Sequence, residues 1–273
     1  MAMPLQSRSC HWQFGGDVEQ QGGLPNLMQF LEAQFPGQFR LQQFAKDLAD
    51  GWFLASDIPV GYGMGSSAAV CVAVFERYST ERGKVRLLEQ GPKAYFAPIE
   101  AHFHGTSSGT DPLIIYQRSS IRLSPDGECE LIPTPQLPKG WQFFLLDTGR
   151  SRETAQIVNY FTHRYDTDSR FRNITDEQWI PATDQAIAAL LSKDIQQLLE
   201  AFRQISAFQL AELPPMVLPE LHDIWQAGLK SDHYLLKICG AGGGGYCLGL
   251  TADWEKTKQM LADWPLEIVQ LHE

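Results

Sequence analysis

Apolar residues early in the chain recur at the spacing of an amphipathic helix. The positions are Leu24, Leu27, Met28, Leu31 and Phe35. Because side chains three or four positions apart share one face of a helix, the pattern predicts a helix over 24–35 that ends at Pro36-Gly37. A second helix is predicted over 41–48, and the apolar segment 70–75 predicts a buried helix that directly follows a glycine-rich loop.

The second half of the chain alternates apolar runs with helical patterns. The run 141–146 is apolar enough to be a buried central strand. Further strands are predicted at 234–238, 246–250 and 266–271. Helices are predicted from about 153, from a cap at Thr183-Asp184, and over 194–211, 218–229 and 253–262. This order of elements predicts an α+β unit.

The pattern is less regular before residue 140. Helical spacing over 86–103 is interrupted by Gly91-Pro92 and Pro98, and the segments 113–116 and 120–123 have strand-like composition. A proline-rich stretch, 132–139, is a natural boundary, and we therefore predict two lobes, 1–135 and 136–273.

The first 23 residues are rich in Gln, Ser and Gly and show no clear period. We expect them to form a poorly ordered leader.

Composition and charge exclude several classes of protein. Apolar residues make up 44% of the 273 residues, as in globular proteins, and no apolar run reaches the roughly 20 residues of a membrane span. We therefore expect a cytoplasmic protein. The net charge of −10 argues against nucleic acid and anionic membranes as partners. The five cysteines are scattered without a CxxC pair, which argues against a disulfide framework or a zinc site.

The stretch 57–69, Asp-Ile-Pro-Val-Gly-Tyr-Gly-Met-Gly-Ser-Ser-Ala-Ala, carries glycines at alternate positions and leads into the apolar segment 70–75. Glycines allow positive φ and close backbone approach, and the first amides of a helix attract anions. Ser66 and Ser67 stand where an N-cap would lie, so a tight turn with an ordinary serine cap is an equally open interpretation. No lysine follows Gly65, which excludes a Walker loop.

Two further segments complete a pattern. Glu100 is followed by 104–111, His-Gly-Thr-Ser-Ser-Gly-Thr-Asp, and Lys237 is followed by the glycine run 240–245. Together with the loop at 57–69, and in this order, they resemble the three-part pattern of the GHMP small-molecule kinases. The first loop is similar to PxxxGxGSSAA, and the middle segment is similar to ExxxHGxPSGxD of the mevalonate kinases, with Ser107 where proline is usual.

The resemblance implies a fold and a set of residue roles. The fold would be two-lobed and α+β, with a ribosomal S5-like N-terminal lobe whose first strands are missing and a ferredoxin-like C-terminal lobe. Ser67 and Glu100 would hold Mg²⁺, and Asp111 would act as the catalytic base toward the acceptor hydroxyl. ATP would be bound by the following residues: Gly61, Gly63, Met64, Gly65, Ser66, Ser67, Ala68, Ala241 and Gly242.

The first motif of the family, a strand with a lysine in a pattern like KxxLxGEH, has no counterpart in residues 1–57. Phe14-Gly15-Gly16-Asp17 is only weakly similar to this motif, and the first lysine of the chain is Lys46. We therefore expect a kinase-like chain whose start codon is assigned too late or whose gene is a fragment. Loss of a preorganised cation commonly costs two to three decades in rate.

Several functions stay open at this point. The resemblance implies an ATP- and Mg²⁺-dependent transferase acting on the primary hydroxyl of mevalonate, a step toward isoprenoid precursors, and it allows a homodimer. Phosphomevalonate or a sugar could be the substrate instead. A nucleotide-binding protein without turnover fits the absent first motif, and a purely structural interpretation would make both glycine segments turns.

Overall fold

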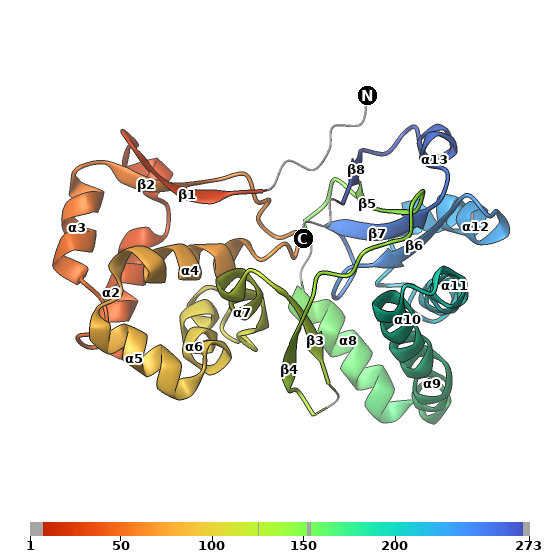
Figure 1. The fold of residues 1–273 in the computed structure, drawn as a ribbon, viewed down its shortest axis with the longest axis horizontal. Coiled ribbons are helices and arrows are strands. Elements are labelled where there is room, and N and C mark those ends of the chain that lie inside the picture. The colour runs from red at the N-terminus through yellow and green to blue at the C-terminus, as the bar shows by residue number, and fades with distance from the viewer. Residues whose placement is uncertain (1–7, 125, 152–153, 270–273) are drawn as a thin grey trace. The chain divides into compact units, whose positions relative to one another are not determined.

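The computed structural model describes residues 8–124, 126–151 and 154–269, which form two compact units (Figure 1). The N-terminal unit consists of residues 8–60 and 64–132. The C-terminal unit consists of residues 61–63 and 133–269. The chain passes between the units at Ile132 and Pro133, inside the proline-rich stretch.

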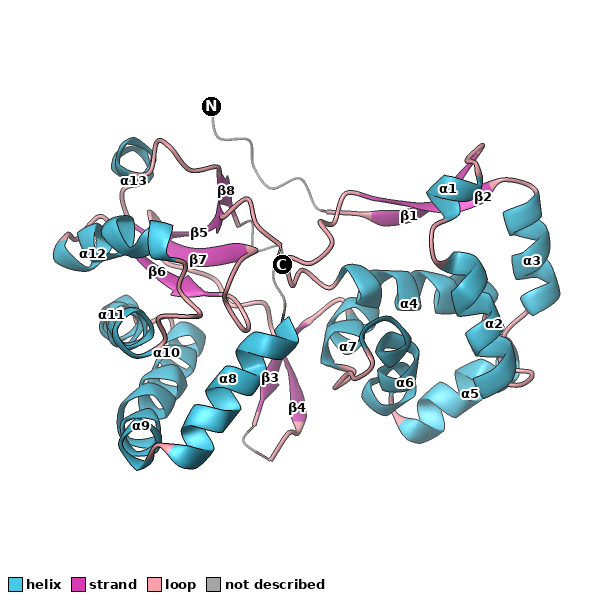
Figure 2. Cartoon of the chain, turned by 180° about the vertical axis from the view of Figure 1, so that it is seen from behind, coloured by secondary structure: helices cyan, strands magenta, loops and turns pink. Residues whose placement is uncertain are grey.

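The N-terminal unit is mostly helical, with two small antiparallel sheets (Figure 2). Its helices are α1 (Val18–Gln21), α2 (Leu24–Gln34), α3 (Leu41–Ala49), α4 (Ser66–Tyr78), α5 (Glu81–Gln90), α6 (Pro92–His104) and α7 (Thr110–Gln117). One hairpin pairs β1 (Cys10–Phe14) with β2 (Trp52–Ser56), and another pairs β3 (Ser120–Leu123) with β4 (Cys129–Ile132). The predicted helices over 24–35, 41–48 and 70–75 are confirmed.

Helix α4 lies at the centre of this unit. Cys71, Val74, Phe75 and Tyr78 on α4 are almost fully buried against apolar side chains of α2, α3, α5 and α6. The apolar segment 70–75 therefore fixes the position of the helix start that follows the glycine loop.

Residues 10–21 correct the prediction of a poorly ordered leader. They form β1 and α1. The residues that this segment contacts lie far along the chain. Trp12 on β1 packs edge-on against Phe44 and Tyr78, and its indole N–H donates to the carbonyl of Ala73 at 3.2 Å. No local periodicity could reveal these contacts.

The strand predicted at 113–116 is wrong, since these residues belong to α7. Gly109 in the left-handed region begins the helix, and Arg118, also left-handed, ends it. A short apolar run fits a buried helix as well as a strand, and here the helix ends decide. Pro98, expected to interrupt a helix, lies inside α6.

The C-terminal unit is built on a four-stranded antiparallel sheet. The strand order is β6 (Tyr234–Ile238), β7 (Tyr246–Thr251), β5 (Gln142–Asp147) and β8 (Leu266–Ile268). Strand β5 lies between β7 and β8 and its four central residues are buried, so the predicted central strand is confirmed. In chain order, strand β5, a helical region, β6, β7, a helix and β8 form the expected ferredoxin-like topology.

Helices surround this sheet (Figure 2). They are α8 (Thr154–Thr167), α9 (Ser169–Ile174), a π-helical turn η1 (Thr175–Trp179), α10 (Ile180–Ser192), α11 (Ile195–Glu212), a 3₁₀ turn η2 (Pro219–Leu221), α12 (His222–Lys230) and α13 (Trp254–Met260). The cap predicted at Thr183-Asp184 is wrong. Thr183 lies inside α10, where its hydroxyl donates to the carbonyl of Trp179 at 2.9 Å.

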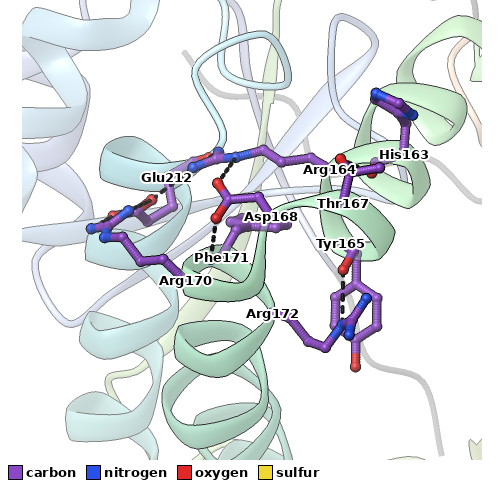
Figure 3. Close-up of polar contacts among 9 residues, drawn as sticks. All are labelled: His163, Arg164, Tyr165, Thr167, Asp168, Arg170, Phe171, Arg172 and Glu212. Carbon is purple, nitrogen blue, oxygen red and sulfur yellow. Dashed lines mark hydrogen bonds and ion pairs between the residues drawn. The ribbon is translucent and has the colours of Figure 1, made fainter.

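An ion-pair cluster fixes the corner between α8, α9 and α11 (Figure 3). Glu212 accepts hydrogen bonds from Arg170 Nη2 at 3.0 Å and from Arg164 Nη2 at 3.1 Å. The hydrogen bond from Arg170, with the charge of both arginines, lowers the pKa of Glu212. Asp168 caps α9 by accepting from the Phe171 N–H at 3.0 Å. Among the described residues, no helix is both long enough and apolar enough to cross a membrane.

Candidate active site in the N-terminal unit

The glycine loop between β2 and α4 has the backbone that the sequence requires. Gly61, Gly63 and Gly65 have φ values of 80°, 69° and 71°, a region that residues with a Cβ rarely adopt. Gly61 and Gly63 belong to the C-terminal unit, whereas Met64 and Gly65 belong to the N-terminal unit.

The start of α4 has no side-chain cap. Gly65 occupies the N-cap position, and no side-chain oxygen accepts from the first turn. Ser66 and Ser67 are the first two helical residues, so their interpretation as caps is wrong. Ala68, the third residue of the helix, is fully buried. The first N–H groups of a helix have no carbonyl one turn earlier, so this end of α4 suits an anion.

Ser67 and Glu100 lie side by side. Glu100 on α6 is 7% exposed, and its Oε1 accepts a hydrogen bond from the Ser67 hydroxyl at 3.3 Å. Its other oxygen, Oε2, accepts a short hydrogen bond from the Ser107 hydroxyl. A carboxylate that leaves water needs such donors, because an unpaired buried charge is costly. Two residues separated by 33 positions in the chain thus share one polar site.

Asp111 is exposed in the first turn of α7. A Cβ built on Gly65 would lie 3.9 Å from the Cβ of Asp111, so the beginnings of α4 and α7 are adjacent. The N-terminal unit therefore brings together Gly65, Ser67, Glu100 and Asp111 around the start of one helix.

The second glycine run lies in the C-terminal unit, between β6 and β7. A Cβ on Gly242 would overlap the carbonyl oxygen of Met216, and one on Gly245 would lie 2.7 Å from the carbonyl oxygen of Tyr62. The carbonyl of Gly245 accepts from the buried Thr148 hydroxyl at 2.7 Å. Close packing explains these glycines without a ligand, and Ala241 is half-buried beside them.

Sequence reasoning missed Tyr62, the residue between two loop glycines. Within the C-terminal unit its ring lies 5.2 Å from the ring of Tyr246. Burial, with the adjacent Asp147 carboxylate, raises the pKa of the Tyr62 hydroxyl. An aromatic residue between two glycines is the feature of the sequence that could have indicated this ring contact. Arg152, which resembles a substrate-side residue of the family, lies outside the described residues.

Two other candidates have structural roles. Asp17, the acidic residue of the segment that is weakly similar to the first family motif, caps α1 by accepting from the Gln20 N–H at 3.0 Å. Cys71 lies one turn after Ser67, where burial, with the charge of Glu100, raises the pKa of its thiol well above the usual range. This thiol is a buried core group.

The side-chain oxygen atoms at this site suit a hard cation that is bound together with a ligand. Glu100 supplies carboxylate oxygens and Ser67 supplies a hydroxyl oxygen, the kinds of atom that Mg²⁺ prefers. Among the residues that the structure describes, no cluster of three or more His, Cys, Asp or Glu could hold a metal. Mg²⁺ usually keeps several waters and uses one or two carboxylates plus substrate phosphates, so a small donor set is compatible with this ion.

Comparisons with known proteins include a match to one family model. Residues 29–117 match the family model of the GHMP kinases N terminal domain. This segment contains the start of α4, Glu100 and Asp111. Residues 29–117 are thus similar to the N-terminal domain of the GHMP kinases.

Mevalonate kinases are among the proteins to which the chain is similar. The chain is 28% identical over 201 residues to the enzyme of Pyrococcus abyssi, which covers 70% of this chain and 56% of that kinase. It is 28% identical over 207 residues to the enzyme of Archaeoglobus fulgidus, which covers 72% of this chain and 64% of that kinase. The matched part thus spans less than two thirds of these relatives.

Solved structures confirm the expected α+β GHMP kinase fold. L. major mevalonate kinase, crystallised with R-mevalonate, aligns with a TM-score of 0.60 at 19% identity, covering 96% of this chain and 82% of that one. Streptococcus pneumoniae phosphomevalonate kinase, crystallised with phosphomevalonate and AMPPNP, aligns with a TM-score of 0.60 at 18% identity, covering 96% of this chain and 88% of that one.

Proposed function

We propose that this chain is an ATP- and Mg²⁺-dependent kinase that transfers the γ-phosphoryl group of ATP to the primary hydroxyl of mevalonate. The observation that carries the proposal is the Ser67–Glu100 pair at the uncapped start of α4, with Asp111 beside it. The mevalonate kinases named among the relatives support the choice of substrate.

Each residue has a role that its position allows. The amides from Gly61 to Ala68 would bind phosphate oxygens, with the positive end of α4 behind them. Ser67 and Glu100 would hold Mg²⁺, which neutralises charge on the phosphates when it is bound. Ala241 and Gly242 of the C-terminal unit are proposed as further nucleotide contacts.

Asp111 is the proposed base. Its exposed carboxylate would accept the proton of the mevalonate hydroxyl as that oxygen bonds to the γ-phosphorus. The bond between the γ-phosphorus and its bridging oxygen breaks with its electron pair on ADP. The reaction produces phosphomevalonate and ADP, which would place the chain in isoprenoid precursor synthesis.

The test combines the protein with ATP, Mg²⁺ and R-mevalonate and measures ADP release. We expect turnover, and Asp111→Asn should lower the rate by at least about 100-fold, the usual contribution of a general base. Asp50→Asn is the control, because Asp50 is an exposed carboxylate at the end of α3. Its rate should equal that of the wild type.

A second substrate has support of its own. The phosphomevalonate kinase of S. pneumoniae aligns as well as the mevalonate kinase of L. major. Turnover of phosphomevalonate, or of a sugar such as galactose, without turnover of mevalonate would replace the proposed substrate and keep the kinase. Binding of ATP in calorimetry without any turnover would instead indicate a nucleotide-binding protein, and thermal stability unchanged by ATP would leave only the structural interpretation.

A further inference from the structure

Ser107 connects α6 and the start of α7 through two hydrogen bonds. It lies in the turn between α6 and α7, and its hydroxyl oxygen accepts a hydrogen bond from the Gly109 N–H at 2.9 Å. The same hydroxyl donates a short hydrogen bond to Oε2 of Glu100. Because an ionised carboxylate can only accept, the hydroxyl of Ser107 is the donor in its bond to Glu100.

The two oxygens of Glu100 are therefore held differently. Oε2 accepts the short bond from Ser107, whereas Oε1 accepts the longer bond, 3.3 Å, from Ser67. Ser107 is itself held by the Gly109 N–H, so Oε2 is the anchored atom. Oε1 is the atom that can shift to a new partner beside the Ser67 hydroxyl.

We propose that Ser107 is a positioning residue that anchors Oε2 of Glu100 and so presents Oε1, together with the Ser67 hydroxyl, to the metal. This inference rests on the proposed metal role of Glu100. Proline, the usual residue at this place in the family pattern, has no hydroxyl, so the device depends on the serine of this chain. Outer-shell partners of this kind fix the orientation of a ligand and are often needed for full metal affinity.

The backbone around Ser107 favours a fixed geometry. Gly109 has a φ of 73°, and a Cβ there would overlap the carbonyl oxygen of Lys93 on α6. The turn is thus packed tightly against the helix that carries Glu100. This packing at Gly109 holds the turn on α6 without the Ser107 hydroxyl. Loss of that hydroxyl should therefore affect the position of the Glu100 carboxylate more than it affects the fold.

Metal affinity is the direct readout. Mn²⁺ is titrated into the full chain with AMPPNP present, and free Mn²⁺ is followed by electron paramagnetic resonance. Ser107→Ala should raise the Mn²⁺ concentration for half-saturation by about 10-fold, the lower end of outer-shell effects. Ser107→Thr keeps the hydroxyl and should restore most of the affinity. Ser107→Cys, nearly the same size with a weak donor, replaces Ser107→Ala if the alanine variant does not fold.

Ser119→Ala is the matched control. Ser119 is also a half-buried serine of the N-terminal unit, but its hydroxyl donates to the carbonyl of Ile132 at 3.3 Å, away from Glu100. Its Mn²⁺ titration should overlay that of the wild type. Equal affinity of Ser107→Ala and wild type, or an equal loss in Ser119→Ala, would overturn the inference.

Kinetics separates this inference from the proposed function. In a wild type that phosphorylates mevalonate, Ser107→Ala should raise the Mg²⁺ concentration for half-maximal rate by a similar factor and leave the KM for mevalonate unchanged. A wild type that binds Mn²⁺ and AMPPNP but turns over no mevalonate would overturn the proposed substrate alone. A wild type that binds no Mn²⁺ with the nucleotide would overturn the metal role of Glu100 and this inference with it.

Discussion

The Asp47 carboxylate on α3 forms a two-point ion pair with the Arg77 guanidinium on α4. Arg77 Nη2 and Nε donate to Oδ2 at 2.6 Å and 3.0 Å, and the Tyr78 hydroxyl donates to the same oxygen at 2.9 Å. The guanidinium carbon lies 4.2 Å from the ring centre of Trp52 on β2. One arginine therefore ties α3, α4 and the strand that leads into the glycine loop.

Removal of the Asp47 carboxylate should destabilise the N-terminal unit. The Asp47 side chain is 8% exposed and that of Arg77 is 30% exposed, so Asp47→Ala leaves a partly buried cation without its partner. We expect the free energy of unfolding to fall by about 3 kcal/mol, the lower end for a broken buried pair. Hydrogen exchange followed by mass spectrometry measures this loss in peptides of α3 and α4.

Glu76→Ala is the control for that experiment. Glu76 is the residue before Arg77, and its ion pair with Arg118 is exposed on both sides. Exposed pairs of this kind contribute at most about 1 kcal/mol. A loss in Glu76→Ala as large as that in Asp47→Ala would show that charge on this surface, and not the buried pair, stabilises the unit.

The same pair predicts how stability depends on pH. Burial alone would raise the pKa of Asp47, but the hydrogen bonds from Arg77, Gln43 and Tyr78 outweigh it, and the pKa is lowered. Since an unfolded aspartate titrates near about 3.9, the contribution is complete above that pH and is lost as pH falls through the lower folded value. The stability difference between wild type and Asp47→Ala should be constant from pH 7 to pH 5 and should shrink only below about pH 4. Shrinkage already at pH 6 would assign the effect to another group.

Helices with their own apolar period were predictable from the sequence. Helix α2 carries its buried face in Leu24, Leu27 and Leu31, and no distant residue is needed to recognise it. Strand β1 could not be predicted, because its register with β2 joins Trp12 to Leu54, 42 positions away. Its stability comes from the pairing and from ring contacts across the fold.

The candidate site was likewise predictable from the sequence only in part. The order of three motifs indicated Ser67, Glu100 and Asp111, and the N-terminal unit brings all three to the start of α4. The bond from Ser107 to Glu100 could not be predicted, since it depends on the path of a five-residue turn between two helices. Gly242 is explained by close packing on Met216, a reason that a glycine run in a sequence cannot reveal.

Ser67→Ala should weaken nucleotide use much more than it weakens the fold. Gly65, and not a serine, occupies the N-cap position of α4, so the variant loses no capping bond, and alanine is the best helix former. We expect the free energy of unfolding to fall by no more than about 1.5 kcal/mol, the lower end for a hydrogen bond to a charged group, because the lost bond is long, at 3.3 Å, and Glu100 keeps its bond from Ser107. Affinity for ATP with Mg²⁺, measured by calorimetry, should fall at least about 10-fold if this hydroxyl binds the metal.

Thr80→Ala should give the opposite result. Thr80 is a true N-cap, whose hydroxyl accepts from the Gly83 N–H at 3.2 Å at the start of α5. Its loss should cost about 1 kcal/mol of stability and leave nucleotide affinity unchanged. A Ser67→Ala variant that behaves like Thr80→Ala, with lower stability and normal affinity, would make Ser67 a structural residue.

Gly109→Ala should disturb the position of Asp111. The φ of Gly109 is 73°, and a Cβ there would overlap the Lys93 carbonyl oxygen and lie 3.1 Å from the Cβ of Ala97. The left-handed backbone alone costs about 1 kcal/mol for a residue with a Cβ, and overpacking against a helix backbone adds about 2 kcal/mol. Helix α7 must therefore move away from α6, and we expect lower stability by about 3 kcal/mol in total.

Gly127→Ala separates the two contributions. Gly127 has a φ of 85°, but a Cβ there would meet no atom within 4 Å, so this variant carries the backbone cost without the overlap. Denaturation should show a loss of about 1 kcal/mol for Gly127→Ala. The difference between the two variants measures how tightly the turn is packed on α6. If both lose the same amount, α7 is free to shift without cost, and Asp111 is not held in place by this contact.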